Sequence, residues 1–508
     1  MTAVDRPLTR TDTAIPGLVI VDLPVHADAR GWFKENWHRE KMRAAGLPDF
    51  GPVQNNISYN DLVGTTRGIH AEPWDKLVSV AAGRVFGAWV DLREGPGFGR
   101  LVTAEIDPAR AVFVPRGVGN SFQTLEPGTA YTYLVNDHWS PAAEYAALDP
   151  ADETVAIPWP IPLAGAAISA KDRTHPRLAD VTPVSPRRIL VLGSDGQLGR
   201  ALRRRLGDAP RFDYADHASL DLTDPDLADA RSWRDYAVIV DAAGYTDVDA
   251  AETLAGRAAA WAVNATGAGR LAQVAAANGL TLVHVSTDYV FDGAAPAPYR
   301  EDAPPAPLGG YGQSKAAGDL AVAATPRHYL VRASWIIGDG HNFVATMAGL
   351  ARRGDDPAVV GDQVGRLTFA DDLAAAIAHL LESEAPFGTY NVTNAGTPRS
   401  WAGIAREVFR LTGHDPGRVR AVTTAEYNAA RPGPTAPRPA NSVLDLAKIT
   451  ATGFTPRDGD LALAQFLAAD VLIPPKKSGR SRTRRLPRRE VGTAESIDAM
   501  LDEMKGEW

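Results

Sequence analysis

The sequence contains no cysteine among its 508 residues. This absence excludes a disulfide framework, zinc sites built on thiolates, iron–sulfur clusters and a cysteine nucleophile. Hydrophobic residues make up 45% of the chain and charged residues 22%, which are ordinary values for a globular protein. The composition therefore excludes a wholly disordered, collagen-like or coiled-coil chain.

Long hydrophobic runs are also missing. No stretch reaches about 18 consecutive apolar residues, the length needed to cross a membrane, and residues 1–17 lack the apolar segment of a signal peptide. We therefore expect no membrane partner and a cytoplasmic location.

Basic residues are outnumbered by acidic ones. The chain has 53 Lys and Arg against 61 Asp and Glu, a net charge of −8. Because negative charge repels polyanions, we expect no nucleic-acid partner for the body of the protein.

Three zones of different character follow one another along the chain. From about residue 15 to 165, short strand-like runs alternate with turn residues, and one helix is expected near 35–45. A β-hairpin is predicted where residues 77–80 lead through Ala81-Ala82-Gly83-Arg84 into residues 85–90. Further strands are expected at 101–106, 111–114 and 130–135. This spacing indicates a β-sandwich, jelly roll or barrel.

The second zone starts near Arg187 and alternates strands with helical patterns. Strands are expected at 188–192, 237–241, 281–286 and 329–332, with a helix over 258–278. Such alternation predicts a parallel sheet. A third zone carries eight Lys or Arg and no acid over 476–489, and we expect a flexible basic tail, with a docking segment or polyanion contact as the alternative. The predicted domains are 1–183, 187–472 and 473–508, with residues 180–186 as linker.

A glycine-rich turn follows the first strand of the second zone and opens a helix. Its glycines, Gly193, Gly196 and Gly199, have a GxxGxxG spacing. Glycines at such a turn let backbone N–H groups approach a dinucleotide pyrophosphate at the helix N-terminus. Asp216 lies 23 residues after Gly193, where an acid usually binds the ribose of NAD. Since His217 follows it, the choice between NADH and NADPH stays open.

A tyrosine and a lysine are spaced four residues apart in the second zone. Tyr311 and Lys315 would share one face of a helix. A lysine cation there lowers the pKa of the tyrosine, so that the phenol can give or take a proton. The same lysine can hold the nicotinamide ribose. Thr287 ends the preceding strand, in the order that this chemistry requires.

The second zone resembles the extended short-chain dehydrogenases, and more narrowly the dTDP-4-dehydrorhamnose reductases. The likeness covers about 187–470 and includes STDYVFDG at 286–293, YGQSK at 311–315, RASW at 332–335, DQVGRLTFADDLA at 362–374 and RPANSVLD at 438–445. It implies an α/β Rossmann domain with a small substrate-binding subdomain. It further implies Tyr311 as proton donor, Lys315 as its partner and Thr287 as the hydroxyl that tunes it.

The same resemblance implies further contacts. Those with the cofactor are Gln197, Leu198, Asp221, Ala242, Ala243 and Tyr245, and those with the sugar nucleotide are Asp288 and Trp335. One departure is DAAGYT at 241–246, where the family more often has NAAAYT. We expect Asp241 and Gly244 to alter the cofactor fit slightly, and His284 and His328 to be structural.

The first zone resembles the dTDP-4-dehydrorhamnose 3,5-epimerases over about 16–180. The likeness includes DARGWFKENW at 28–37, VQNNIS at 53–58, RGIH at 67–70, DKLVSVAAGRVFGAWVDLRE at 75–94, VPRG at 114–117, IPWP at 157–160 and SAKD at 169–172. It implies an all-β, cupin-like jelly roll. Epimerisation removes a proton beside a keto carbon and returns one to the opposite face, so it needs a base, an acid and stabilisation of an enolate.

By this resemblance His70 is the base, oriented and charged by Asp172. Tyr133 is the acid, with Tyr131 as the less favoured choice, and Lys76 stabilises the enolate oxygen. The implied nucleotide-sugar contacts are Arg30, Glu35, Gln54, Asn56, Arg67, Glu144 and Lys171. Two departures stand out. Asn120 replaces a family histidine that faces the ligand, and the segment between His70 and Lys76 is shorter than usual.

Together the two resemblances imply a bifunctional enzyme that makes dTDP-L-rhamnose. The first half would epimerise dTDP-4-dehydro-6-deoxy-D-glucose, and the second would reduce the C4 ketone with NADPH or NADH. Family likeness also implies a homodimer. Two alternatives remain: a reductase for a related deoxysugar with a partial or inactive epimerase half, and a regulatory subunit that binds these ligands without turnover. No ligand spacing in the sequence indicates a metal site.

Overall fold

The computed structural model describes residues 7–138, 145–431 and 433–472. The chain divides into two compact units, residues 1–186 and 187–508, and each is described by itself. Glu144 and the predicted basic tail at 473–508 lie outside the described residues.

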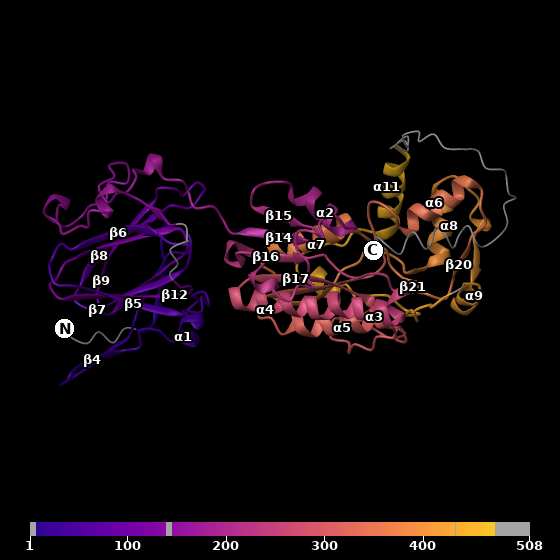
Figure 1. Cartoon of the computed structure of the whole chain (residues 1–508), viewed down its shortest axis with the longest axis horizontal. Coiled ribbons are helices and arrows are strands. Elements are labelled where there is room, and N and C mark those ends of the chain that lie inside the picture. The colour runs from indigo at the N-terminus through magenta and orange to yellow at the C-terminus, as the bar shows by residue number, and fades with distance from the viewer. Residues whose placement is uncertain (1–6, 139–144, 432, 473–508) are drawn as a thin grey trace. The chain divides into compact units, whose positions relative to one another are not determined.

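The first unit is built from two antiparallel sheets (Figure 1). In spatial order, one sheet contains β1 (Thr9–Asp12), β2 (Val19–Asp22), β10 (Arg110–Val114), β7 (Lys76–Ala82), β12 (Thr129–Val135) and β5 (Gln54–Asn60). The other contains β13 (Ala146–Ala147), β6 (Thr66–Ala71), β11 (Val118–Thr124), β8 (Val85–Asp91) and β9 (Leu101–Ile106). The hairpin β3 (Val25–Asp28) and β4 (Gly31–Lys34), the helix α1 (Arg39–Ala44) and three 3₁₀ turns, η1 (Leu163–Gly165), η2 (Asp172–Thr174) and η3 (Leu178–Asp180), complete it.

The core of this unit lies between the two sheets. Val78 and Val112 come from the first sheet, and Val85, Trp89 and Phe122 come from the second, and all belong to one buried cluster. Alternate residues of each strand supply these side chains because successive residues of a strand point to opposite faces. The all-β character predicted from the spacing of strands is therefore present.

The predicted hairpin at residues 77–90 is wrong in its pairing. Strands β7 and β8 form as expected, but β7 pairs with β10 and β12, whereas β8 pairs with β11 and β9. The turn passes from one sheet to the other, with Gly83 at a φ of 80°. Both strands are buried along most of their length, so each is an interior strand that needs neighbours on both sides. Local sequence does not distinguish such a crossing from a hairpin.

The second unit contains a parallel sheet of six strands. Their order is β15 (Phe212–Ala215), β14 (Arg188–Leu192), β16 (Tyr236–Asp241), β17 (Thr281–Thr287), β18 (His328–Ala333) and β23 (Gly388–Asn391). Helices cover both faces of this sheet. Successive residues of a strand point to opposite faces, so they pack against different helices. Leu282 packs with α4 (Ala268–Asn278) and α5 (Gly310–Ala323), whereas Val283 packs with α2 (Gln197–Leu206) and α7 (Ala370–Glu382).

The predicted helix over 258–278 is interrupted in its middle. It consists of α3 (Leu254–Ala260), a π-helical segment η7 (Trp261–Gly267) and α4. Short 3₁₀ turns precede or follow the strands at η4 (Leu227–Asp229), η5 (Trp233–Asp235), η6 (Ala250–Glu252) and η8 (Asp288–Val290).

A smaller part of the second unit has a core of its own. Met347, Phe409 and Leu463 are members of this separate cluster. Its elements are α6 (Phe343–Arg353), α8 (Trp401–Leu411), α9 (Thr424–Ala429), α11 (Gly459–Leu472), η9 (Pro416–Arg418) and the paired strands β19 (Ile336–Ile337) with β22 (Thr368–Phe369), β20 (Ala358–Val360) with β25 (Arg420–Val422), and β21 (Val364–Gly365) with β24 (Arg399–Ser400). The helix α10 (Ala447–Ala451) returns to the large sheet, where Ile449 is buried.

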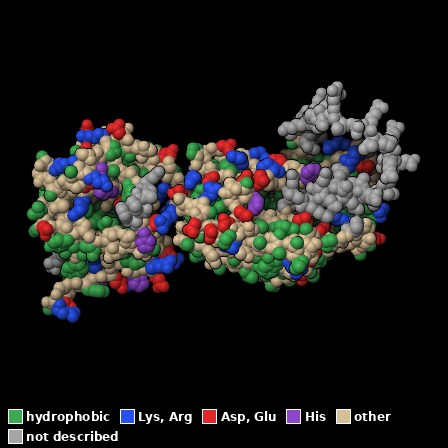
Figure 2. Space-filling view, viewed as in Figure 1, with side chains coloured by type: hydrophobic (Ala, Val, Ile, Leu, Met, Phe, Trp, Pro, Cys, Tyr) green, Lys and Arg blue, Asp and Glu red, His purple; other side chains and the backbone are tan. Residues whose placement is uncertain are grey.

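Acidic and basic side chains are interspersed over the visible surface of both units (Figure 2). None of the helices that the structure describes is long and apolar enough to span a bilayer.

Candidate functional sites

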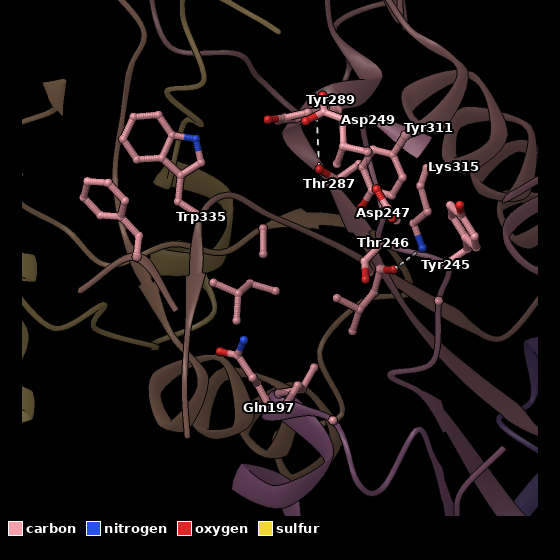
Figure 3. Close-up of a pocket in the computed structure, with 18 of the residues that line it drawn as sticks. Gln197, Tyr245, Thr246, Asp247, Asp249, Thr287, Tyr289, Tyr311, Lys315 and Trp335 are labelled. Carbon is pink, nitrogen blue, oxygen red and sulfur yellow. Dashed lines mark hydrogen bonds between the residues drawn. The ribbon is translucent and has the colours of Figure 1, made fainter. Parts of the chain in front are cut away.

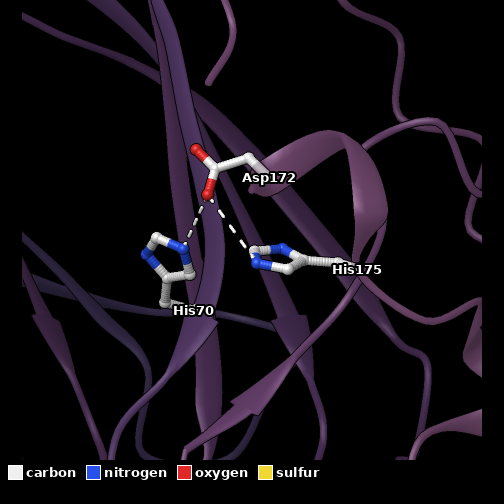
Figure 4. Close-up of side chains that lie close together, drawn as sticks. All are labelled: His70, Asp172 and His175. Carbon is white, nitrogen blue, oxygen red and sulfur yellow. Dashed lines mark hydrogen bonds and ion pairs between the residues drawn. The ribbon is translucent and has the colours of Figure 1, made fainter. Parts of the chain in front are cut away.

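The first unit brings together two residues that are 102 positions apart in the sequence. His70 Nε2 lies 3.0 Å from Asp172 Oδ1 (Figure 4). His70 comes from strand β6, whereas Asp172 opens the 3₁₀ turn η2 and is buried. Because a carboxylate only accepts hydrogen bonds, Nε2 carries a proton, and in the neutral imidazole Nδ1 is then the nitrogen with the lone pair. The His70 side chain is 38% exposed, so this ring has access to a ligand.

A second histidine, which sequence reasoning did not select, joins this pair. His175 Nε2 is 3.7 Å from Asp172 Oδ1, and the two histidine rings are 5.2 Å apart. Burial and the nearby His70 ring lower the pKa of His175. The three residues offer ligand atoms within 4.8 Å of one another, a set that could hold a metal ion. No local spacing shows this set, because His70 is distant in sequence from the other two.

Tyr133 and Lys76 are neighbours on adjacent strands of the other sheet. Lys76 Nζ lies 5.8 Å from the Tyr133 ring centroid, and it forms an ion pair with Glu72. Burial, followed by the charge of Glu72, raises the pKa of Tyr133, so its phenol stays protonated at neutral pH. Glu72 lies in the short segment that departs from the family pattern, and sequence reasoning did not select it.

Asn120, the residue that replaces the family histidine, has a fixed side chain. Its Oδ1 accepts hydrogen bonds from Trp89 Nε1 at 2.9 Å and from the Tyr131 hydroxyl at 3.1 Å. Asn120 is also the register partner of His70 across strands β11 and β6. The Tyr131 phenol is buried and committed to Asn120, whereas Tyr133 is only partly buried.

The other predicted contacts of the first unit are spread over several elements. Arg67 lies on β6, and Gln54 donates to Asn56 on β5. Arg30 and Glu35 are paired at the surface with Asp28 and Lys41. Lys171 is exposed beside Asp172. Among the described residues, no hydrogen bond or ion pair joins Arg30 or Glu35 to His70, Asp172 or His175.

A cavity of about 800 Å³ lies in the second unit, at the carboxyl ends of the parallel strands. Parallel α/β sheets bind ligands at this edge. The cavity is lined by most of the residues predicted for the cofactor and substrate: Gly193, Gly196, Gln197, Leu198, Asp216, Asp221, Ala242, Ala243, Tyr245, Thr287, Asp288, Tyr311, Lys315 and Trp335. Gly199 and Asp241 are not among its lining residues.

The glycine turn has the close approaches that its motif requires. Gly193 has a φ of 68°, and a Cβ there would lie 2.8 Å from Ala242 O. A Cβ on Gly199 would lie 2.1 Å from Gly193 O. Gly199 therefore serves the packing of helix α2 against the turn rather than the cavity wall. Gln197 lines the cavity, and its buried Oε1 has no protein partner among the described residues. These features fit a dinucleotide.

Tyr311 and Lys315 both enter the cavity from helix α5 (Figure 3). Contrary to the expected lowering by Lys315, burial raises the pKa of Tyr311. The nearby Thr287 hydroxyl opposes this shift, and the phenol stays protonated at neutral pH. Lys315 Nζ donates to Val285 O at 2.7 Å. Burial lowers the pKa of Lys315, and Asp241 opposes that effect.

One side of the cavity has an aromatic wall. Trp335 stacks on Trp401 with ring centroids 3.8 Å apart, and its backbone φ is 49°. Trp401 is the first residue of α8 and was not predicted, because an aromatic residue on a helix is indistinguishable from core in sequence. Asp288 is buried, and its Oδ2 has no protein partner among the described residues.

Two further polar groups were not predicted: Arg438, which lines the cavity, and Asn264, which holds the lining residue Tyr245. Asn264 in the π-helical segment bonds both backbone groups of Tyr245 and the Ser314 hydroxyl, at 2.9–3.0 Å. Arg438 donates to Asp249 at 2.9 Å, beside Tyr289. Asn264 was not predicted because no sequence pattern indicates a π-helical segment. Arg438 was not predicted because it lies 189 residues after its partner Asp249.

Comparison with known proteins gives a match for each unit. Residues 12–180 match the family model described as dTDP-4-dehydrorhamnose 3,5-epimerase, and residues 187–471 match that described as RmlD substrate binding domain. A relative from Streptococcus pyogenes called "Protein RmlC homolog" is 47% identical over 37% of this chain and 98% of its own length.

Relatives of the second unit include a dTDP-4-dehydrorhamnose reductase from Mycobacterium tuberculosis. It is 40% identical over 59% of this chain and 97% of its own length. A crystal structure of dTDP-4-dehydrorhamnose reductase from Bacillus anthracis in complex with NADP is 31% identical, with a TM-score of 0.51, and covers 56% of this chain and 99% of that chain.

Proposed function

Since this chain belongs to the dTDP-4-dehydrorhamnose 3,5-epimerase family over residues 12–180 and to the dTDP-4-dehydrorhamnose reductase family over residues 187–471, we propose that it is a bifunctional enzyme of dTDP-L-rhamnose formation. The observation that carries the proposal is that each unit assembles its own acid–base group from separate elements. His70 meets Asp172 in one unit, and Thr287, Tyr311 and Lys315 meet at the cavity of the other.

In the first unit, His70 is the base in this proposal. Asp172 fixes the imidazole tautomer, so that Nδ1 faces the substrate with its lone pair, and stabilises the imidazolium that forms. Tyr133, kept protonated by burial, returns a proton on the other side, and Lys76 balances the enolate charge. Arg30, Glu35, Gln54, Asn56, Arg67, Asn120, Glu144 and Lys171 hold the sugar nucleotide.

In the second unit, Tyr311 protonates the C4 oxygen of the ketone, since its phenol keeps its proton in the buried site. Lys315 offsets the charge that develops on the phenolate, and Thr287 orients the phenol. Gly193, Gly196, Gln197 and the loop of Ala242, Ala243 and Tyr245 hold the cofactor, with Asp216 and Asp221 at its adenosine end. A bound NADPH or NADH would supply the hydride. Asp288 and Trp335 hold the sugar.

The finer structural assignments belong to the same proposal. The two-sheet unit is assigned as a jelly roll over 1–183, and the parallel-sheet unit as a Rossmann domain with a small substrate-binding subdomain over 187–472. The substrates are dTDP-4-dehydro-6-deoxy sugars, and the proposed location is the cytoplasm.

The first experiment follows absorbance at 340 nm with purified protein, dTDP-4-dehydro-6-deoxy-D-glucose and NADPH or NADH, without another enzyme. We expect oxidation of the cofactor and dTDP-L-rhamnose as product by NMR. Asp172→Asn should abolish oxidation and should be rescued by added epimerase, whereas Tyr311→Phe should not be rescued. Oxidation of the wild type only after epimerase is added would refute the epimerase half.

A further inference from the structure

A row of three buried polar side chains leads away from the reductase cavity. Asp241 ends strand β16, His284 lies within strand β17, and Lys315 comes from helix α5. Asp241 and His284 are register partners in the parallel pair. The three residues are 1%, 1% and 4% exposed. Three ionisable groups are costly to bury in this way unless each is hydrogen-bonded.

The alternation of the strands explains how these residues meet. Ile239 and Leu282 face the core shared with α4 and α5, so Asp241 and His284, two positions further along each strand, face the same side. Lys315 approaches them from α5. Asp241 therefore faces the core side of the sheet and is not among the residues that line the cavity.

The hydrogen bonds of the three residues all point one way: Lys315 donates to His284, and His284 donates to Asp241. His284 Nδ1 lies 2.7 Å from Asp241 Oδ2, and His284 Nε2 lies 3.4 Å from Lys315 Nζ. An ammonium group only donates and a carboxylate only accepts, so Nδ1 carries the proton and Nε2 accepts from the lysine. A second ammonium proton goes to Val285 O, which leaves the third free for the cavity.

The second oxygen of Asp241 is also in use. Asp241 Oδ1 accepts a hydrogen bond from Ala243 N at 3.2 Å, in the loop that lines the cavity. The asparagine that the family more often has at position 241 offers a single acceptor oxygen. With that oxygen placed toward Ala243, its amide nitrogen would present a donor rather than an acceptor to His284 Nδ1, and it carries no charge to balance Lys315.

The charged and titratable groups around Lys315 come from several elements. Asp241 and His284 lie on β16 and β17, and Tyr311 and Asp319 lie on α5 itself. Asp319 is paired with Arg332 of β18 at 3.3 Å. The remaining titratable groups nearby are Tyr245 of the loop after β16 and Asp288 of η8, which line the same cavity as Lys315. Of these carboxylates, Asp241 is joined to Lys315 by hydrogen bonds through His284, whereas Asp319 is offset by Arg332 and burial raises the pKa of Asp288 to about 7.

We propose that Asp241 and His284 are positioning residues of the reductase, which hold Lys315 as an oriented ammonium group. This inference rests on the proposed reductase function. Asp241 fixes the tautomer of His284, and His284 fixes the direction of Lys315. The carboxylate also favours the charged form of the lysine against the effect of burial.

The test compares the pH dependence of kcat in wild type, Asp241→Asn and Asp213→Asn, with excess separate epimerase so that reduction is limiting. Asp213 is a matched control on strand β15, where it bonds Arg231 and Tyr236. Without the Asp241 charge, the pKa of Lys315 falls. We therefore expect the alkaline limb of kcat to move to lower pH by about one unit in Asp241→Asn. Asp213→Asn should keep the wild-type limb.

A purely structural role for Asp241 would lower kcat equally at every pH, and an unmoved limb would overturn the proposal. If the wild type itself oxidises no cofactor, the proposed function fails, and a second measurement still tests the inference. In ¹⁵N-histidine NMR without ligands, the neutral ring of His284, assigned through His284→Gln, should be the Nδ1–H tautomer. An Nε2–H tautomer would refute the proposal. Because this measurement is made on the wild type, it tests the proposal even if Asp241→Asn does not fold.

Discussion

At the scale of single residues, burial controls the charge of a carboxyl group in the reductase cavity. Asp288 is 2% exposed, and desolvation raises its pKa to about 7. The folded-state pKa lies above the unfolded value, so the proton is bound more tightly in the folded protein. The resulting stabilisation is complete below the unfolded pKa and is lost as the pH rises through about 7.

Replacing Asp288 by asparagine should therefore change the pH dependence of stability. Asp288→Asn has no carboxyl group to ionise, so its melting temperature relative to wild type should be higher at pH 8.5 than at pH 5.5 by a few degrees, roughly. Differential scanning calorimetry measures this difference. Asp292→Asn is the control, because Asp292 is exposed and its hydrogen bond with Tyr299 lowers its pKa. A difference that does not grow with pH would contradict the prediction.

Residues within recognisable motifs could be placed from the sequence, and their partners could not. Tyr311 and Lys315 lie together in the cavity as the helical spacing predicts. His175, by contrast, meets His70 only through a contact between β6 and a turn about a hundred residues later. Asn264 bonds the Tyr245 backbone from a π-helical segment, and no sequence pattern predicts such a segment. Such contacts depend on tertiary packing, which one sequence does not contain.

At the scale of elements, strands were predictable and their pairing was less so. The parallel sheet follows from alternating strands and helices, and β14, β16, β17 and β18 lie at the expected places. Strands β7 and β8 also lie as expected, yet they belong to different sheets. A turn with Gly83 is compatible with both arrangements, and only the burial of both strands distinguishes them.

The close approach of helix α2 to the glycine turn leads to a prediction about this element. In Gly199→Ala the new Cβ would lie 2.1 Å from Gly193 O, so the helix must move away from the turn. We expect NADPH to bind at least about tenfold more weakly, because the helix N-terminus no longer faces the pyrophosphate. NADPH fluorescence titration measures this.

The matched control for that substitution is Gly269→Ala on helix α4. Its Cβ would meet Ala321 Cβ at an ordinary 3.8 Å. This variant should bind NADPH like the wild type. Equal affinity of all three proteins would show that the turn does not depend on Gly199. Retained epimerase activity in Gly199→Ala would confirm that its first unit is folded.

At the scale of the whole molecule, the first unit has an edge strand with apolar surface. Ile57 and Tyr59 on β5 are 67% and 62% exposed, and Phe33 of β4 is 66% exposed. Strand edges with apolar side chains favour pairing with another chain. These side chains support the homodimer expected from family likeness.

Light scattering after size exclusion tests this expectation. The wild type should have about twice the chain mass of 54.1 kDa. The double variant Ile57→Lys and Tyr59→Lys should be a monomer, because two lysines on one edge strand repel their copies and stay hydrated. Leu320→Lys is the control, since Leu320 is similarly exposed at 70% but lies on helix α5 of the other unit. A wild-type mass of one chain would contradict the prediction.

The presence of both units on one continuous chain has a consequence for metabolic control. Separate enzymes can be made in any ratio, but here every synthesised molecule carries one His70–Asp172 pair and one Tyr311–Lys315 pair. If the proposed activities hold, gene dosage and promoter strength cannot change their ratio. The balance between supply and removal of the keto sugar is then set only by the two turnover numbers, which selection must have adjusted through amino-acid substitutions within this one chain.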